Sequence, residues 1–184
     1  MWHNFKLCLM LKSGYAAGRH NAHTGGGSNQ LCLPEEPQWK SHVNTSVAVG
    51  WLFGIEYRTH NVHEVLFSGV NNQGSNAFHG KPTPCAICYV PGRSASLMIP
   101  ARTSCPDGWT QEYTGYLMSE HSFNVNIGSR YSTTYICVDG APEVATGPVL
   151  QAQAVLLVVK VGCGTLPCSK YNNKWEVACV VCSK

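Results

Sequence analysis

The ten cysteines of this chain fall into two sets that share an order and a sequence context. Each set begins with a lone cysteine followed by a Gly-Tyr pair, continues with a cysteine that precedes a proline, and ends on Cys-x-x-Cys. Self-similarity of this kind decides which segments are equivalent, and it predicts a tandem duplication of a unit of about 80 residues. The first set is Cys8, Gly14-Tyr15, Cys32, Pro37, Cys85 and Cys88, and the second is Cys105, Gly115-Tyr116, Cys137, Pro142, Cys179 and Cys182.

Composition narrows the class of protein. Charged residues make up 12% of the 184 residues, whereas an ordinary soluble domain has about 25%. The net charge is +3 and no extended basic run is present, so we expect no nucleic-acid partner. The apolar stretch Val149–Val161 is shorter than the ~20 residues that a membrane span requires, so we expect no membrane span. Ten cysteines at such low charge indicate an oxidising compartment and a secreted, extracellular protein.

The cysteines could bind zinc or form disulfides. Cys163, Cys168, Cys179 and Cys182 are spaced loosely like a zinc ribbon. Of these four cysteines, however, the first set has counterparts only for the last two, Cys85 and Cys88. In both sets, strand-forming residues separate the two cysteines of the Cys-x-x-Cys. Three steps along a strand span about 10 Å, which exceeds the ~7 Å limit between the Cα atoms of a disulfide. We therefore expect disulfides and no metal cofactor, with each cysteine of a Cys-x-x-Cys bonded to a separate partner from the start of its own unit.

The N-terminal stretch resembles a signal peptide, with Lys6 and the apolar residues 7–11 followed by Ala16-Ala17-Gly18. Cys8 and Gly14-Tyr15 nevertheless have counterparts in the second set. Cleavage near Ala17 would also leave nine cysteines, an odd number for a secreted chain. We expect residues 1–18 to belong to the mature structure and any signal to lie upstream.

The chain is expected to be all-β, because 18 glycines and 10 prolines interrupt it and no segment sustains a helical apolar period. The predicted architecture is two tandem homologous, disulfide-bonded antiparallel β units related by a pseudo-twofold. They span residues 1–90 and 91–184, with a linker at about 91–96. Predicted strands are 7–11, 30–33, 47–57, 64–67, 86–90 and 97–99, then 110–118, 131–138, 149–161 and 175–181.

Three segments resemble a known family: 97–109 (LMIPARTSCPDGW), 113–119 (YTGYLMS) and 163–168 (CGTLPC). They look like the noncollagenous C-terminal domain of invertebrate short-chain, spongin-type collagens. That domain is in turn similar to the duplicated C-terminal domain of type IV collagen. The resemblance covers essentially the whole chain and implies the pairs Cys8–Cys88, Cys32–Cys85, Cys105–Cys182, Cys137–Cys179 and Cys163–Cys168.

The sequence departs from those collagens because it has no Gly-X-Y tract, in which glycine recurs every third residue. The glycines of Thr24–Ser28 are therefore expected in a loop. In lacking that tract the chain is similar to the egg lectins of sea hares, which carry the ten-cysteine duplicated domain. That likeness implies binding of galactose-type or uronic-acid sugars.

Catalysis is not expected, because no nucleophile signature is present and the ten carboxylates form no suggestive cluster. Seven of the eight histidines lie in the first half, including His20-x-x-His23 and His60-x-x-His63. On a helix this spacing could place two imidazoles on one metal. Both pairs lie in predicted loops, where surface histidines are the favoured interpretation, and metal ligation or a pH-sensitive contact are the alternatives.

Five tryptophans and eight tyrosines can supply flat faces for sugar rings, although Tyr15, Tyr116 and Trp109 are expected in strand or core packing. Polar loops 19–29 and 120–130 follow the Gly-Tyr strand in both units, which predicts two similar sugar sites and bivalent binding. Arg19 and Arg130 could supply the cation that a uronate needs. Candidate sugar-binding residues are Arg19, His20, His23, Asn29, His121 and Arg130, and Asn44 begins a glycosylation sequon.

Three functions are consistent with these observations. The first is a lectin-like extracellular protein that binds glycans. The second is a matrix assembly domain, in which β edges and apolar faces drive formation of a homo-oligomer with matrix partners. The third is a metal-storing or metal-crosslinking matrix protein, which rests on the histidines.

Overall fold

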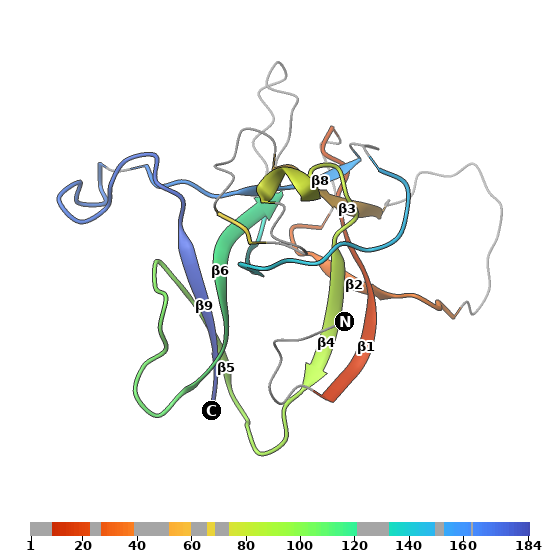
Figure 1. Ribbon diagram of the computed structural model, residues 1–184, viewed down its shortest axis with the longest axis horizontal. Helices are drawn as coiled ribbons and strands as arrows, with labels where there is room; N and C mark the ends of the chain where they lie inside the picture. Colours follow the sequence, from red (N-terminus) through yellow and green to blue (C-terminus); the bar gives the residue numbers. More distant parts are fainter. Residues whose placement is uncertain are drawn as a thin grey trace.

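The computed structural model describes residues 9–22, 27–38, 52–59, 66–68, 74–120, 133–149, 153–162 and 164–184 (Figure 1). Over these residues the chain is all-β, with nine strands in one curled mixed sheet and a single-turn 3-10 helix, η2. The main path through the sheet is β2-β1-β3-β8-β6-β9-β5, and β4 and β7 pair with β1 and β6. The elements are β1 (Leu9–Gly18), β2 (Leu31–Pro34), β3 (Phe53–Tyr57), η2 (Ser75–Phe78), β4 (Pro84–Tyr89), β5 (Ser96–Pro100), β6 (Thr110–Glu120), β7 (Tyr135–Asp139), β8 (Ala154–Val158) and β9 (Ala178–Ser183).

Two long strands organise the sheet. Along one edge β1 pairs first with β4 and then with β3, and along its other edge it pairs with β2. In the same way β6 pairs first with β9 and then with β8, and on its other edge with β7. All six of these pairings are antiparallel.

We call β1–β4 the first strand set and β5–β9 the second. The registers of the two strand sets also correspond. Gly14 lies opposite Cys85 on β4, and Gly115 lies opposite Cys179 on β9. A β-bulge interrupts β1 between Met10 and Lys12, and β6 has its bulge between Gln111 and Tyr113. Measured from Gly14 and Gly115, the two bulges fall at the same position. Each set therefore has the same strand pairing around a Gly-Tyr pair.

The two glycines are needed for close approach of the backbone. A Cβ added to Gly14 would lie 1.7 Å from the carbonyl oxygen of Leu33, and a Cβ added to Gly115 would lie 1.7 Å from that of Val138. Real Cβ atoms do not approach a backbone oxygen so closely. The Gly-Tyr pairs therefore occur where β2 and β7 press against the long strands.

Two disulfides cross over the long strands at these glycines. Cys32 on β2 bonds to Cys85 on β4, and Cys137 on β7 bonds to Cys179 on β9. The bonded Cα atoms are 5.6 and 5.8 Å apart, whereas strands on either side of a third lie about 9.5 Å apart in a flat sheet. The sheet is therefore sharply folded at each glycine.

A third disulfide, Cys105–Cys182, joins the loop before β6 to β9. The three bonds are among the five pairs that the collagen resemblance implies. Cys88 and Cys168 are also disulfide-bonded, and their expected partners, Cys8 and Cys163, lie outside the described residues. Because Cys179 and Cys182 are in separate disulfides, the zinc-ribbon alternative is wrong for these two sulfurs.

A parallel pairing joins the first strand set to the second. β3 and β8 run parallel, with Ile55 opposite Ala154 and Tyr57 opposite Leu156. The sequence predicted two antiparallel β units, whereas the structure has one curled mixed sheet, because this long-range parallel pairing leaves no local sequence signal. We call this β3–β8 junction the seam.

The largest core cluster lies at the seam and draws residues from both strand sets. Phe67 is 1% exposed and packs edge-on against Phe78 and Tyr116, with ring centroids 6.4 and 5.3 Å away. This packing supports the core role expected for Tyr116. The cluster comprises Ala16, Ile55, Tyr57, Phe67, Phe78, Met118, Val138, Ala154 and Leu156.

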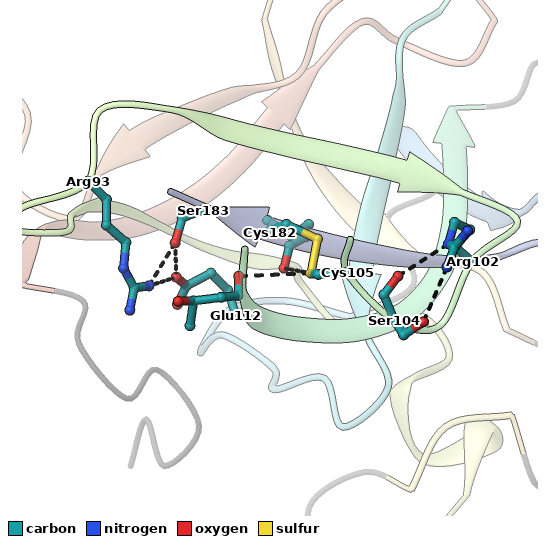
Figure 2. Close-up of a disulfide and its surroundings, with 9 residues drawn as sticks. Arg93, Arg102, Ser104, Cys105, Glu112, Cys182 and Ser183 are labelled. Atoms are coloured by element: carbon teal, nitrogen blue, oxygen red, sulfur yellow. Dashed lines mark hydrogen bonds and ion pairs between the residues drawn. A yellow bond between two sulfur atoms is a disulfide. The ribbon is translucent and has the colours of Figure 1, made fainter. Parts of the chain in front are cut away.

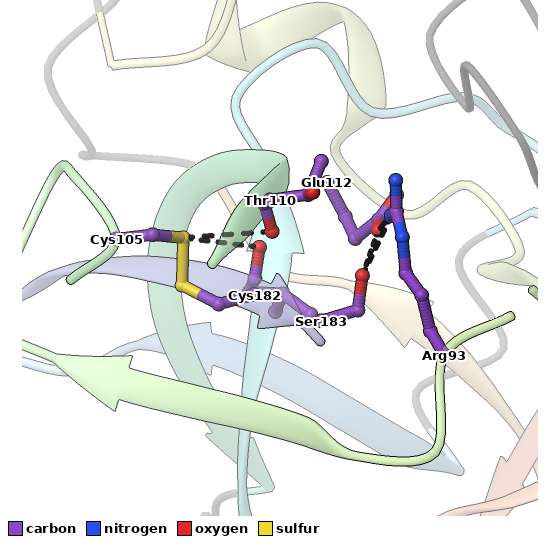
Figure 3. Close-up of polar contacts among 7 residues, drawn as sticks. Arg93, Cys105, Thr110, Glu112, Cys182 and Ser183 are labelled. Atoms are coloured by element: carbon purple, nitrogen blue, oxygen red, sulfur yellow. Dashed lines mark hydrogen bonds and ion pairs between the residues drawn. A yellow bond between two sulfur atoms is a disulfide. The ribbon is translucent and has the colours of Figure 1, made fainter. Parts of the chain in front are cut away.

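The predicted linker is fastened to the second strand set. Figure 2 shows Arg93 beside Glu112, at the bulge of β6, and Ser183 at the end of β9. The Arg93 guanidinium pairs with the Glu112 carboxylate and donates a 2.7 Å hydrogen bond to Ser183 Oγ, which itself donates to Glu112. Figure 3 shows this cluster next to the Cys105–Cys182 bond.

Several strand boundaries differ from the sequence prediction. β1 continues to Gly18 instead of ending at residue 11, and β8 covers only five residues of the apolar stretch 149–161. Leu66 and Phe67, which were predicted in a strand, lie in a loop. Phe67 still enters the core from this loop. Among the described residues, no helix is long and apolar enough to cross a membrane.

Candidate functional site

The two loops expected to bind sugar follow strand ends that lie close together. The first begins where β1 ends at Gly18, and the second begins at Glu120, the last residue of β6. A Cβ added to Gly18 would lie 1.7 Å from Glu120 Oε1. The Glu120 side chain therefore lies directly against the end of β1, and the two loops start at one place.

Arg19 and Glu120 are both buried at this point, with 5% and 6% of their surface exposed. Burial raises the pKa of the Glu120 carboxyl, while the positive charge and backbone N–H of Arg19 act in the opposite direction. Arg19 Nη1 also donates a 3.2 Å hydrogen bond to the carbonyl of His20. The guanidinium expected to receive a uronate is thus buried beside a carboxyl group.

His20 presents a half-buried ring next to an aromatic side chain. Its ring packs edge-on against Phe53 at the start of β3, with centroids 4.8 Å apart. His20 Nδ1 accepts a 3.1 Å hydrogen bond from the backbone N–H of Ala22, so the proton of a neutral ring lies on Nε2. A neutral His20 ring therefore carries its N–H on Nε2, beside the Phe53 ring.

The seam also holds the backbone of the first loop. The backbone N–H of Asn21, a buried residue, donates a 2.6 Å hydrogen bond to the carbonyl of Gln153, just before β8. This hydrogen bond holds the backbone at Asn21 against the second strand set. It therefore also restricts the orientation of the neighbouring His20.

The far ends of the two loops are joined as well. Thr134, just before β7, donates its backbone N–H to the carbonyl of Ser28 at 2.7 Å. Its hydroxyl lies 2.5 Å from Gln30 Oε1, and Gln30 Nε2 donates to the Thr134 carbonyl at 3.4 Å. Asn29, a candidate sugar-binding residue, lies exposed between Ser28 and Gln30. The described residues that flank the two loops are therefore in contact, Gly18 with Glu120 and Ser28 with Thr134.

The structure describes three of the six candidate sugar-binding residues: Arg19 and His20 follow the end of β1, and Asn29 adjoins Ser28 at the contact with Thr134. The other three, His23, His121 and Arg130, lie outside the described residues, as do Asn44, His60 and His63. Within the described part of the chain, no group of three or more His, Cys, Asp or Glu side chains is placed to hold a metal ion.

Sequence reasoning missed Glu120, Phe53 and Thr134 as components of this site. Glu120 could have been found from the sequence. When Gly14 is aligned with Gly115, Arg19-His20 falls at the same positions as Glu120-His121. Phe53 and Thr134 carry no such signal. Phe53 reaches the site because β3 pairs with β1, with Phe53 opposite Gly18. Thr134 reaches it through its hydrogen bond to Ser28, so both contacts join residues far apart in sequence.

Comparison with known proteins gives no further assignment. No protein-family model matches the sequence, and no solved structure matches the fold. Function must therefore be argued from the site.

Proposed function

We propose that this chain is a secreted, non-enzymatic carbohydrate-binding protein of the lectin type, built from two copies of one β unit. Duplication is supported by matching registers around Gly14 and Gly115, by a bulge at the same position in both long strands, and by disulfides that cross these strands in the same way. Secretion is supported by the disulfides, which persist in oxidising compartments.

The observation that carries the proposal is the contact between the residues that flank the two polar loops. The loops occupy equivalent places in the two units, so separate units would have two separate sites. Here the carboxylate of Glu120 lies against Gly18, and Thr134 is bonded to Ser28. We therefore infer one composite sugar site per chain, in place of the two sites that the sequence suggested.

The seam favours a neutral, galactose-type sugar over a uronate. A uronate needs an accessible cation, whereas the Arg19 guanidinium is buried beside Glu120. The His20 ring, half-buried against Phe53, can supply a flat face for the apolar side of a sugar. The exposed Asn29 can exchange hydrogen bonds with hydroxyl groups. Glycan binding of this kind needs no cofactor.

A glycan array and a titration test this proposal. Wild-type protein should bind terminal galactose-type sugars, and calorimetric titration should give one sugar per chain. His20→Ala should weaken binding about tenfold, the effect of losing about 1.4 kcal/mol. Tyr89→Ser is the control, because Tyr89 is exposed at the opposite end of β1–β4. An empty array at high protein concentration would refute sugar binding, and two sugars per chain would refute the composite site.

A matrix assembly domain is the second candidate function. It is supported by exposed apolar side chains on β1, β2 and β4, which could be covered in a homo-oligomer or by matrix partners. Light scattering of the non-reduced protein should then detect trimers or hexamers, and a monomer at all concentrations would refute assembly. The exposed residues are Leu9, Leu31, Leu33, Ile87 and Tyr89.

A further inference from the structure

Residues 159–162 and 164–177, which we call the knob, project from the sheet between β8 and β9. In Figure 1 this blue segment extends away from the strands. A short two-stranded stem supports it: the Val177 N–H donates to the Val159 carbonyl and the Val161 N–H to the Trp175 carbonyl, at 2.9 and 2.8 Å. Cys168 within the knob is disulfide-bonded. The knob is thus a braced projection open to solvent.

Trp175 on this stem has 64% of its surface exposed, more than any other large apolar side chain in the described residues. Single exposed apolar residues are common on proteins. A tryptophan differs because its large ring is frequently an anchor for binding. The residue before it, Lys174, has a φ of 67°, a conformation that lysine rarely adopts outside tight turns. This turn places a lysine immediately before the exposed ring.

The knob also concentrates positive charge. It contains three lysines and one glutamate, a net charge of +2 in a chain whose total is +3. Lys160 pairs with Glu176 at 2.9 Å. Lys170 and Lys174 are exposed, and neither forms an ion pair with an acidic side chain of the described residues. Lys174 therefore provides an exposed positive charge directly before Trp175 in the sequence, and Lys170 provides a second one within the knob.

We propose that the knob binds anionic polysaccharide, with the Trp175 ring against a sugar face and the two lysines facing carboxylate or sulfate groups. Charge complementarity selects an anionic partner, and the flat ring suits a pyranose. Polar side chains complete the surface, including Asn172 and Asn173, which can exchange hydrogen bonds with hydroxyl groups. This surface lies outside the composite site at the seam, so it could hold the protein on a charged matrix while that site binds neutral sugar.

Binding of immobilised polygalacturonate and chondroitin sulfate tests the proposal, with neutral galactan as the comparison. The two polymers distinguish carboxylate from sulfate as the source of the negative charge. Wild-type protein should bind at least one of them at low salt, and binding should weaken as salt rises, because exposed charges are screened. No binding at low salt, or binding that salt does not weaken, would overturn the proposal.

Three variants locate the surface. Trp175→Ala should weaken binding about tenfold, which corresponds to the loss of one anchoring contact. Lys174→Gly should weaken it roughly threefold, and it cannot act by backbone strain because glycine readily adopts a positive φ. Lys184→Gln is the matched control, since it removes the same charge at the far end of β9 and should leave binding near the wild-type level.

Equal weakening by Lys184→Gln, or no change with Trp175→Ala, would overturn the assignment to the knob. Vesicles of phosphatidylserine provide a further comparison. If the protein bound them as tightly as it binds the polysaccharide, and this binding required Trp175, the choice of polysaccharide as the partner would be overturned. The result can be distinguished from the proposed function, because galactose binding on the array should be unchanged in both knob variants.

Discussion

The strands around β1 and those around β6 share a pairing pattern but differ in how their outer strands are secured. Within the described residues, β4 pairs with β1 alone at positions 84–89, whereas β9 lies between β6 and β5. The bulge of β6 presents Glu112 to Arg93 and Ser183, while the bulge of β1 has Leu11 at the corresponding position. Within the described residues, both strand sets thus contain a paired glycine and a crossing disulfide, and the ionic cluster of Arg93, Glu112 and Ser183 belongs to the second.

The largest effect is expected from filling the space at the paired glycines. Gly14→Ala and Gly115→Ala each place a Cβ 1.7 Å from a backbone oxygen, so each should destabilise the protein by more than about 4 kcal/mol and abolish secretion. Gly54→Ala is the control, because a Cβ there has nothing within 4 Å. Secretion yield and urea unfolding measure the effect. If alanine were tolerated at only one of the two positions, Gly14 and Gly115 would not be structurally equivalent.

The two crossing disulfides should be similar in stability contribution but different in accessibility. They join residues 53 and 42 positions apart, so removing either should cost about 4 kcal/mol in the chain-entropy model. Cys179 is fully buried, whereas Cys32 and Cys85 are half-buried. Mild reductant should therefore open Cys32–Cys85 first, as measured by timed alkylation and mass spectrometry. Earlier opening of Cys137–Cys179 would contradict this order.

A smaller effect is expected at the ionic cluster of the second set. Glu112→Gln leaves Arg93 without its carboxylate partner and should cost about 2 kcal/mol, because hydrogen bonds to charged groups contribute more than neutral ones. Hydrogen exchange should become faster at residues 94–100 and stay unchanged in β1. Arg102→Met is the control, since Arg102 is exposed and, among the described residues, its side chain bonds only to nearby Ser104. Equal effects of the two substitutions would show that the cluster does not secure the linker.

The smallest effect is expected from titration of Glu120 at the seam. Burial raises the pKa of this carboxyl in the folded protein, so its contribution to stability is fully present below the unfolded pKa of about 4.3 and is lost as pH rises through the folded value. Glu120→Gln should remove this loss and be relatively more stable at neutral pH. Arg19→Met should enlarge it, because the Arg19 charge lowers the Glu120 pKa. Urea unfolding between pH 4 and 8 measures the stability of both variants. If the wild type and the variants had identical profiles of stability against pH, the raised pKa would not belong to Glu120.

The sequence contains much of the local architecture but little of the seam. Cys-x-x-Cys within strand-forming residues correctly implied separate partners for Cys179 and Cys182, because strand geometry fixes where neighbouring side chains point. The parallel pairing of Ile55 with Ala154 had no local signal. Burial of Arg19 was missed for the same reason, since it depends on Glu120, which is remote in sequence.

The seam also has a consequence for biosynthesis. Ile55 and its partner Ala154 are separated by about 100 residues, so at ~5–20 residues per second the ribosome needs roughly 5–20 s to make the second after the first. During that interval β3 presents an unpaired strand edge, which is a template for aggregation. The nascent first half must therefore be shielded until β8 arrives, and slow synthesis through residues 60–150 should reduce the yield of secreted protein.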